Sequence, residues 1–274
     1  THWSLASSTS ETLDLIAGYC GVPKEEITYT CGGVNHMDWF LNIEFLDGRD
    51  AYPDLLRAGE NPEIYKTRAV QFELLKHFGY WTTESSRHCA EYVPYFMPRD
   101  ADRASVFVHG RDTRADVIET AARWGADADL MQQLDGRKPL NLRRSFEYGI
   151  HIMHALVTDN VYRMHLNVMN DGCIENFTAD TCVEVCCTTD RTGVHPHRVG
   201  RLPVSLAALC RGLADMQTLA SDAYLEHDLG KAFEACLIDP TTAASATPAR
   251  IRACFNELLA AEEPWLGAAW GTSL

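Results

Sequence analysis

The sequence predicts an α+β fold in which a mixed or antiparallel sheet is covered by helices. The chain has 274 residues, 46% of them hydrophobic, so it is long and apolar enough to bury a core. Segments near Thr28, Trp39, Asn160 and Thr181 alternate apolar and polar residues, as half-buried strands do. The stretches between and after them repeat apolar residues at helical spacing, which places helices beside the sheet.

The N-terminal region is expected to form a helix followed by two strands. Ser10 can cap a helix from Glu11 to about Tyr19, because its hydroxyl can accept from a free N–H. Gly21 stops that helix, and residues 27–30 then alternate like a strand. A second strand, from Trp39 to Leu46, ends in Asp-Gly, a dipeptide that closes tight hairpins.

The rest of the chain is expected to contain further helices and strands. The helices are predicted at residues 63–78, 142–157, 203–226, 229–238 and 248–261, and the strands at residues 160–169 and 181–188. Gly79 supplies a C-cap for the first of these helices.

The helix predicted from Leu142 to Val157 carries a row of functional side chains. Arg144, Tyr148 and His151 are spaced by four and then three residues, so they share one face. An anion contact, a phenol and a titratable ring suit a helix that faces a site. A tyrosine that only packs, with its hydroxyl at the surface, explains the same spacing. The apolar contact of this helix is expected from Leu142, Phe146, Ile150 and Met153.

The stretch from Cys31 to Phe40 has the composition of a binding site. Gly32 and Gly33 allow backbone conformations and close approaches that side chains forbid. Asn35 and His36 then place an amide and an imidazole at the start of a strand, which suits a polar ligand or a metal. A histidine at a strand edge can also be a purely structural residue.

A second polar segment, from Thr83 to Tyr92, is dense in hydrogen-bonding groups. Burying so many polar groups is costly unless a ligand or partner satisfies them. The segment is therefore interpreted either as part of a site or as an ordinary surface loop.

Charge and cysteine content bear on the class of function. The formal net charge is −14, from 38 acidic against 24 basic residues, which disfavours a nucleic-acid partner. No stretch approaches the ~20 apolar residues of a membrane span, so no membrane partner is expected. The ten cysteines form no CxxC pair, which favours buried free thiols in a reducing cytoplasm. The motifs GxSxG, HExxH, GxGxxG and the P-loop are missing, so no cofactor-binding half is expected.

Several strings follow one another along the chain in a distinctive order. They are residues 31–41, beginning Cys-Gly-Gly-Val-Asn-His, and residues 83–96, 144–148, 167–174, 180–185 and 239–244. Their order resembles glycoside hydrolase family 4, and within it the alpha-galactosidase and alpha-glucosidase branch. The resemblance implies that residues 1–274 are a single substrate- and metal-binding domain, similar to the C-terminal domain of lactate dehydrogenases. The N-terminal dinucleotide-binding domain of the full-length enzymes is missing from this sequence.

The resemblance also implies an unusual redox route to hydrolysis. In the family, NAD takes hydride from C3 of the sugar, a base removes the acidified C2 proton, and the glycosidic oxygen leaves by elimination. Water then adds and the hydride returns. A divalent metal, usually manganese, polarises the C2 and C3 oxygens. The chain is thus expected to belong to an NAD- and metal-dependent alpha-glycosidase acting on a small-molecule glycoside, and to be incomplete for turnover alone.

The resemblance assigns roles to individual residues. His36 is expected to bind the metal and Asn35 a substrate hydroxyl. Tyr148 is expected to be the base, with Arg144 as an anion contact that favours its phenolate. Sugar hydroxyls are expected to contact Glu84, His88 and Glu91.

One departure from the family pattern affects the metal. The family's second metal ligand is a cysteine in a Gly-Leu-Cys-His string, and the corresponding position here falls near Ala6, which cannot bind a metal. The ligand set is therefore incomplete, unless Cys31 substitutes for the lost thiolate.

Two other functions compete with this interpretation. A non-catalytic sugar-binding or assembly protein descended from such an enzyme would also lack the cysteine and the cofactor domain. A metal hydrolase built on His36 and His88, with water as nucleophile, would act without NAD. In either case, apolar surface left by the missing domain would favour a homo-oligomer.

Overall fold

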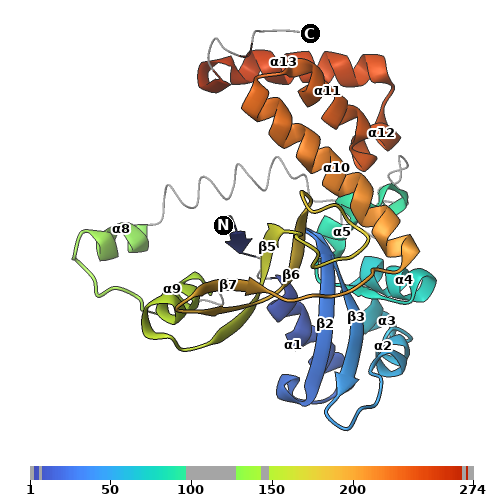
Figure 1. Ribbon diagram of the computed structural model, residues 1–274, viewed down its shortest axis with the longest axis vertical. Coiled ribbons are helices and arrows are strands. Elements are labelled where there is room, and N and C mark those ends of the chain that lie inside the picture. The colour runs from blue at the N-terminus through green and yellow to red at the C-terminus, as the bar shows by residue number, and fades with distance from the viewer. Residues whose placement is uncertain (1–2, 6–7, 97–127, 143–147, 267–269, 271–274) are drawn as a thin grey trace. The chain divides into compact units, whose positions relative to one another are not determined.

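The computed structural model describes residues 3–5, 8–96, 128–142, 148–266 and 270 (Figure 1). The chain divides into two compact units, one of residues 1–108 and 148–274 and one of residues 109–147. The second unit contributes helix α8, Ala128–Leu134, to the described part. The single substrate- and metal-binding domain over residues 1–274 stays a prediction.

The first unit is built on a seven-stranded antiparallel sheet. Its order is β1 (Trp3–Leu5), β5 (Tyr162–Met169), β6 (Cys182–Asp190), β2 (Ile27–Val34), β3 (Met37–Phe45) and β4 (Trp81–Thr82), and β7 (Gly193–Pro196) pairs with β6. Figure 1 shows β2 and β3 as a long blue hairpin beside β6. The four strands predicted from alternation are all present, which confirms the α+β class and the antiparallel sheet.

Helices precede, connect and follow these strands. They are α1 (Ser8–Cys20), α2 (Tyr52–Ala58), α3 (Pro62–Tyr65), α4 (Ala69–Phe78), α5 (Ser86–Tyr92), α9 (Gly149–Thr158), α10 (Val204–Glu226), α11 (Leu229–Ile238), α12 (Pro240–Ser245) and α13 (Pro248–Leu266). Short 3₁₀ turns cover Lys24–Glu26 and Pro94–Phe96. In the described part of the chain, no helix is long and apolar enough to cross a membrane.

Two apolar cores lie on the sheet. In the first, alternate residues of β5 and β6, such as Leu166 and Val185, pack with Leu206 of α10. In the second, Ile16 of α1 packs with Phe40 and other residues of β2, β3 and α4. Because side chains alternate along a strand, the residues between those of the first core on β5 and β6 point to the opposite face. Those residues are polar: Arg163, His165, Asn167, Glu184 and Cys186.

The helix predicted over residues 63–78 is interrupted in the structure. α3 ends at Tyr65 and α4 begins at Ala69, and the Thr67 hydroxyl donates to the Ile64 carbonyl at 2.7 Å in the break. Gly79 ends α4 with φ of 82°, and its N–H donates to the Leu75 carbonyl, as the C-cap prediction requires.

The helix predicted from Leu142 begins later, and the prediction of its buried face is wrong. α9 starts at Gly149, with Tyr148 as N-cap, and Leu142 lies outside it. Ile150 and Met153 are 66% and 62% exposed, whereas Ile152 and Ala155 are buried. The predicted phase depended in part on Leu142, which lies outside α9. Arg144 and Phe146 lie outside the described residues.

Candidate functional site

The Asn-His pair predicted as a site forms the tip of the β2–β3 hairpin. Val34 pairs with Met37, so Asn35 and His36 are the two turn residues between the strands. His36 has φ of 65°, a left-handed conformation that is unfavourable for a residue with a side chain. The turn directs two polar side chains to the end of a rigid two-stranded ribbon, where a strained backbone is a common mark of function.

Glu84 brings the hairpin together with the polar segment that follows β4. Its two carboxylate oxygens lie 3.2 Å from Nδ1 of His36 and 2.9 Å from Nδ1 of His88. Ser85 caps α5 by accepting a hydrogen bond from the His88 N–H, and the Gln71 side chain donates to the Glu84 carbonyl. The polar segment from Thr83 to Tyr92 is therefore largely helix α5 and its N-terminal cap, and not an ordinary surface loop. We call His36, Glu84 and His88 the hairpin cluster.

The charges of the hairpin cluster stabilise one another. Burial raises the pKa of Glu84, but its contacts with His36 and His88 outweigh that effect and hold the pKa at about 2. The contact with Glu84 raises the pKa of His36, against the opposing effect of burial, and the charges of Glu84 and Glu91 add to the rise. A carboxylate shared by two imidazoles is thus the stable form of this site.

The hairpin cluster has the donor set of a metal site. One candidate ligand atom from each of its three residues lies within 4.8 Å of the other two. Two imidazole nitrogens and a carboxylate oxygen suit first-row divalent ions. The predicted metal ligand His36 therefore lies with Glu84 and His88, which the sequence assigned to sugar hydroxyls. No cysteine is part of this group among the described residues.

Other predicted substrate contacts lie around the hairpin cluster. The Asn35 side-chain oxygen accepts from the Asn167 amide at 3.1 Å, which joins the hairpin to β5. Glu91 lies on α5 with its side chain 42% exposed and 3.8 Å from Arg87. Asn167 was not singled out from the sequence, although its place between Leu166 and Val168 in an alternating strand puts it on the polar face.

Tyr148, the predicted base, is buried in the first core at 5% exposure. Its hydroxyl donates to the His165 carbonyl at 2.6 Å, and its ring lies 6.5 Å from that of Tyr162. A phenol acting as base must first release this hydrogen bond, so the role of Tyr148 stays a prediction. Arg144 and Ala6, which bear on the same chemistry, lie outside the described residues.

A second group of ligand-type side chains lies on the polar face of the sheet. Cys31, Asp38 and His165 are all buried, and one candidate ligand atom from each lies within 4.8 Å of the others. We call these three residues the sheet cluster. Cys31, considered from the sequence as a substitute for the family's missing cysteine ligand beside His36, is grouped here with a different histidine.

Glu184 lies beside the sheet cluster. Gly33 pairs with Asp38 on one side and with Glu184 on the other, so the two carboxyl groups flank a residue without a side chain. Burial, and then the charge of Glu84, raises the pKa of Glu184 to about 8. Burial also raises the pKa of Asp38, and lowers that of His165 to about 3. No role was predicted for these three residues from the sequence.

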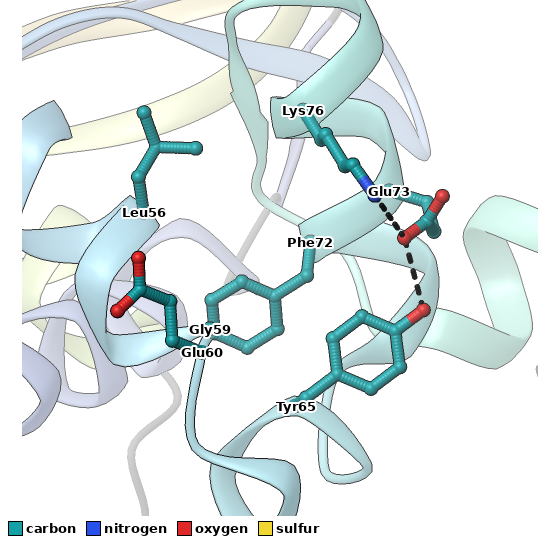
Figure 2. Close-up of a pocket in the computed structure, with 7 residues that line it drawn as sticks. All are labelled: Leu56, Gly59, Glu60, Tyr65, Phe72, Glu73 and Lys76. Atoms are coloured by element: carbon teal, nitrogen blue, oxygen red, sulfur yellow. Dashed lines mark hydrogen bonds and ion pairs between the residues drawn. The ribbon is translucent and has the colours of Figure 1, made fainter.

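Two hollows elsewhere in the first unit contain none of the predicted site residues. One, of about 280 Å³, lies between α2 and α4 and is shown in Figure 2. There Glu73 accepts from the Tyr65 hydroxyl at 3.0 Å and lies 3.9 Å from Lys76. Three of its polar side chains, Tyr65, Glu73 and Lys76, thus contact one another. The other hollow, of about 380 Å³, is mostly apolar and is lined by α11, α12 and α13.

Comparisons with known proteins identify the family. A model of the C-terminal domain of family 4 glycosyl hydrolases matches residues 31–242. An alpha-galactosidase of Bacillus subtilis is 32% identical over 249 residues, which cover 90% of this chain and 57% of that protein. An alpha-galactosidase of Rhizobium meliloti is 32% identical over 260 residues, covering 92% of this chain and 53% of that protein. The chain belongs to glycosyl hydrolase family 4 and spans about half the length of these relatives.

Solved structures share the fold. A Bacillus subtilis protein described as a glucosidase gives a TM-score of 0.81 at 20% identity and covers 94% of this chain and 62% of its own. A 6-phospho-alpha-glucosidase from gut microorganisms, in complex with NAD and Mn²⁺, gives 0.72 at 18% identity, covering 97% and 61%. These likenesses establish the fold of the C-terminal part.

Proposed function

We propose that this chain is the substrate- and metal-binding part of an alpha-galactosidase- or alpha-glucosidase-like hydrolase that depends on NAD and a divalent metal. The observation that carries the proposal is the hairpin cluster, in which His36, Glu84 and His88 meet at the end of the hairpin. Family membership supports a glycoside as the substrate.

His36, Glu84 and His88 would hold the metal in this proposal. A bound divalent ion such as manganese supplies Lewis-acid polarisation of sugar oxygens. Around it, Asn35 is fixed by Asn167 and can orient a sugar hydroxyl, and the half-exposed Glu91 can accept from another. Hydrogen bonds that hold a side chain before substrate arrives reduce the entropy lost on binding.

Tyr148 is proposed as the base of the reaction, with Arg144 as an anion contact. Its hydroxyl already serves as a donor to a backbone carbonyl, so deprotonation would require that bond to break. No residue of this chain is assigned to NAD, because the sequence contains no GxGxxG fingerprint. We also propose that the protein is cytoplasmic and forms a homo-oligomer.

The function is tested in the chain extended upstream to its natural start. Release of nitrophenol from nitrophenyl alpha-galactoside and alpha-glucoside is measured with and without NAD and manganese. We expect activity only with both, and its loss in His36→Ala, Glu84→Gln and Tyr148→Phe. Glu73→Gln is the matched control, because Glu73 also pairs with a histidine, His77, at 3.2 Å.

Two results would replace this function with a rival. Sugar binding without activity in the extended protein would favour a non-catalytic binding or assembly protein. Activity that needs the metal but not NAD would favour a metal hydrolase with water as nucleophile.

A further inference from the structure

We propose that the sheet cluster, Cys31, Asp38 and His165, binds a second divalent metal ion of the zinc class. This site would be separate from the hairpin cluster and would join three strands of the sheet. The proposal begins from geometry, because one ligand-type atom of each residue lies within 4.8 Å of the other two.

The register of the strands brings the three residues to one face. Cys31 pairs with Phe40 and Gly33 pairs with Asp38, so Cys31 and Asp38 point to the same side of the β2–β3 ribbon. His165 comes from β5, and its ring stacks on Tyr29 of β2 with centroids 5.7 Å apart. The imidazole therefore extends past β6 toward β2, where Cys31 lies.

The cluster contains buried polar atoms without hydrogen-bond partners. Asp38 is 0% exposed and His165 is 5% exposed. Asp38 Oδ2 and His165 Nε2 have no hydrogen-bond partner among the described residues. Oε1 of Glu184, across Gly33 from Asp38, is likewise buried and without such a partner. Leaving several buried polar atoms unsatisfied is unfavourable, and a bound cation removes the cost for acceptor atoms.

The donor types favour zinc over manganese or magnesium. A thiolate and an imidazole are softer ligands than carboxylates and water, and zinc sites are commonly built from sulfur, nitrogen and oxygen. Three protein ligands leave a fourth position for the Glu184 carboxylate or for water. The hairpin cluster has no sulfur donor, so the two sites should differ in metal preference.

Binding requires that Cys31 lose its proton, because the thiolate is the metal ligand. The metal–sulfur bond replaces the sulfur–proton bond, and the proton passes to solvent or buffer, with no change of oxidation state. In the absence of metal, shared protons are the alternative way to neutralise Asp38 and Glu184. Zinc and protons therefore compete for the same atoms.

The test uses the 274-residue chain stripped of metal with a chelator and titrated with cobalt chloride, then with zinc chloride. Cobalt bound by a cysteine thiolate absorbs through sulfur-to-metal charge transfer. We expect this absorption in the unmodified chain, its loss on adding one equivalent of zinc, and its loss in Cys31→Ser and His165→Gln.

Two controls separate this site from the others. Cys210→Ser changes a cysteine that is also fully buried but lies outside the cluster, so it should retain the absorption. His36→Ala disables the hairpin cluster and should also retain it, so failure of the proposed function and failure of this inference are distinguishable. Circular dichroism checks that each variant is folded.

The inference is overturned if the unmodified chain shows no thiolate-to-cobalt absorption, a result that needs no variant. It is also overturned if folded Cys31→Ser keeps the absorption at full intensity. In the first case the cluster is neutralised by shared protons, and in the second another cysteine binds the metal.

Discussion

The hairpin cluster and the sheet cluster each include a residue of the β2–β3 hairpin, but their carboxyl groups have opposite electrostatic environments. At the hairpin tip, Glu84 is paired with two imidazoles. Asp38 lies on β3, two residues after His36. It is fully buried, and its Oδ2 has no hydrogen-bond partner among the described residues. Two imidazole partners keep the first carboxylate ionised, whereas burial outweighs the single hydrogen bond from the Trp39 N–H and favours the neutral form of the second. The partners that surround a carboxyl group, and not its burial alone, thus decide the direction of its pH dependence.

The substitution expected to have the largest effect on this contrast is Glu184→Gln, measured in the metal-free chain. The folded-state pKa of Glu184 is about 8, above its usual 4.5, so the folded protein retains a proton that the unfolded chain has lost. The free energy of unfolding should therefore fall as pH rises from 4.5 to about 8, by several kcal/mol. Urea unfolding across this range should show the slope in the unmodified chain and a smaller slope in Glu184→Gln, where the raised pKa of Asp38 still contributes.

Glu175→Gln is the control for that experiment, because Glu175 is an exposed carboxyl near the same sheet. It should leave the slope unchanged. An equal slope in Glu184→Gln and the unmodified chain would mean that Glu184 does not hold the proton, and the contrast between the two clusters would be wrong.

Glu84→Gln tests the other half of the comparison and should have the opposite sign. The pKa of Glu84 is about 2, below its usual 4.5, so its contribution is present above pH 4.5 and is lost as pH falls toward 2. We expect a contribution on the order of 2–3 kcal/mol, read from urea unfolding at low and moderate pH. Glu73→Gln is the control. If Glu84→Gln loses as much stability at low pH as the unmodified chain does, the ion pairs of Glu84 with His36 and His88 are contradicted.

The stability of the same cluster also depends on pH above about 6.5, through His36. The pKa of His36 is raised, so its contribution is present below the usual 6.5 and is lost as pH rises through the folded-state pKa. Glu84→Gln removes this dependence too, because Glu84 is the largest cause of the shift. Stability due to the hairpin cluster is therefore greatest between about pH 4.5 and 6.5.

The sequence predicted most of the sheet and the C-terminal helices because their patterns are local. Strand alternation near Thr28, Trp39, Asn160 and Thr181 matches β2, β3, β5 and β6, and the helix expected at 229–238 has the same bounds as α11. The start of α9 was missed because the spacing of apolar residues does not mark Gly149 as its first residue. Propensity and spacing are weak where tertiary contacts decide the boundary.

The site was only partly predictable because its members meet across the sheet. His36 was identified from the local Asn-His motif, and Glu84 and His88 from the polar segment of the resemblance. That Glu84 joins both histidines follows from strand order, which places β4 beside β3. Asp38 and His165 were not singled out because each is one of several polar residues that alternate with apolar ones along its strand, as in any half-buried strand. Their proximity depends on β2 pairing with both β3 and β6.

Tyr148→Phe is expected to change the free energy of unfolding less than the substitutions of Glu184 and Glu84 do. The change removes the hydroxyl that donates to the carbonyl of His165, a member of the sheet cluster. One such hydrogen bond contributes about 1 kcal/mol, which urea unfolding can measure. If Tyr148 is the base, kcat of the extended protein falls far more than this loss of stability accounts for. Equal activity in Tyr148→Phe would leave the residue with a structural role alone.

The smallest expected effect concerns the backbone that presents His36. Its φ of 65° is favourable for glycine and unfavourable for any residue with a Cβ atom. Both His36→Ala and His36→Gly remove the imidazole, so they lose the same contact with Glu84. The glycine variant should nevertheless be the more stable of the two by about 1 kcal/mol, despite its greater entropy when unfolded.

At Asn35, whose φ is not positive, the same pair of changes should favour alanine instead. If alanine is equal or better at both positions, the turn relaxes once the imidazole is gone. The left-handed conformation would then be imposed by the contact between His36 and Glu84, not by the two-residue hairpin.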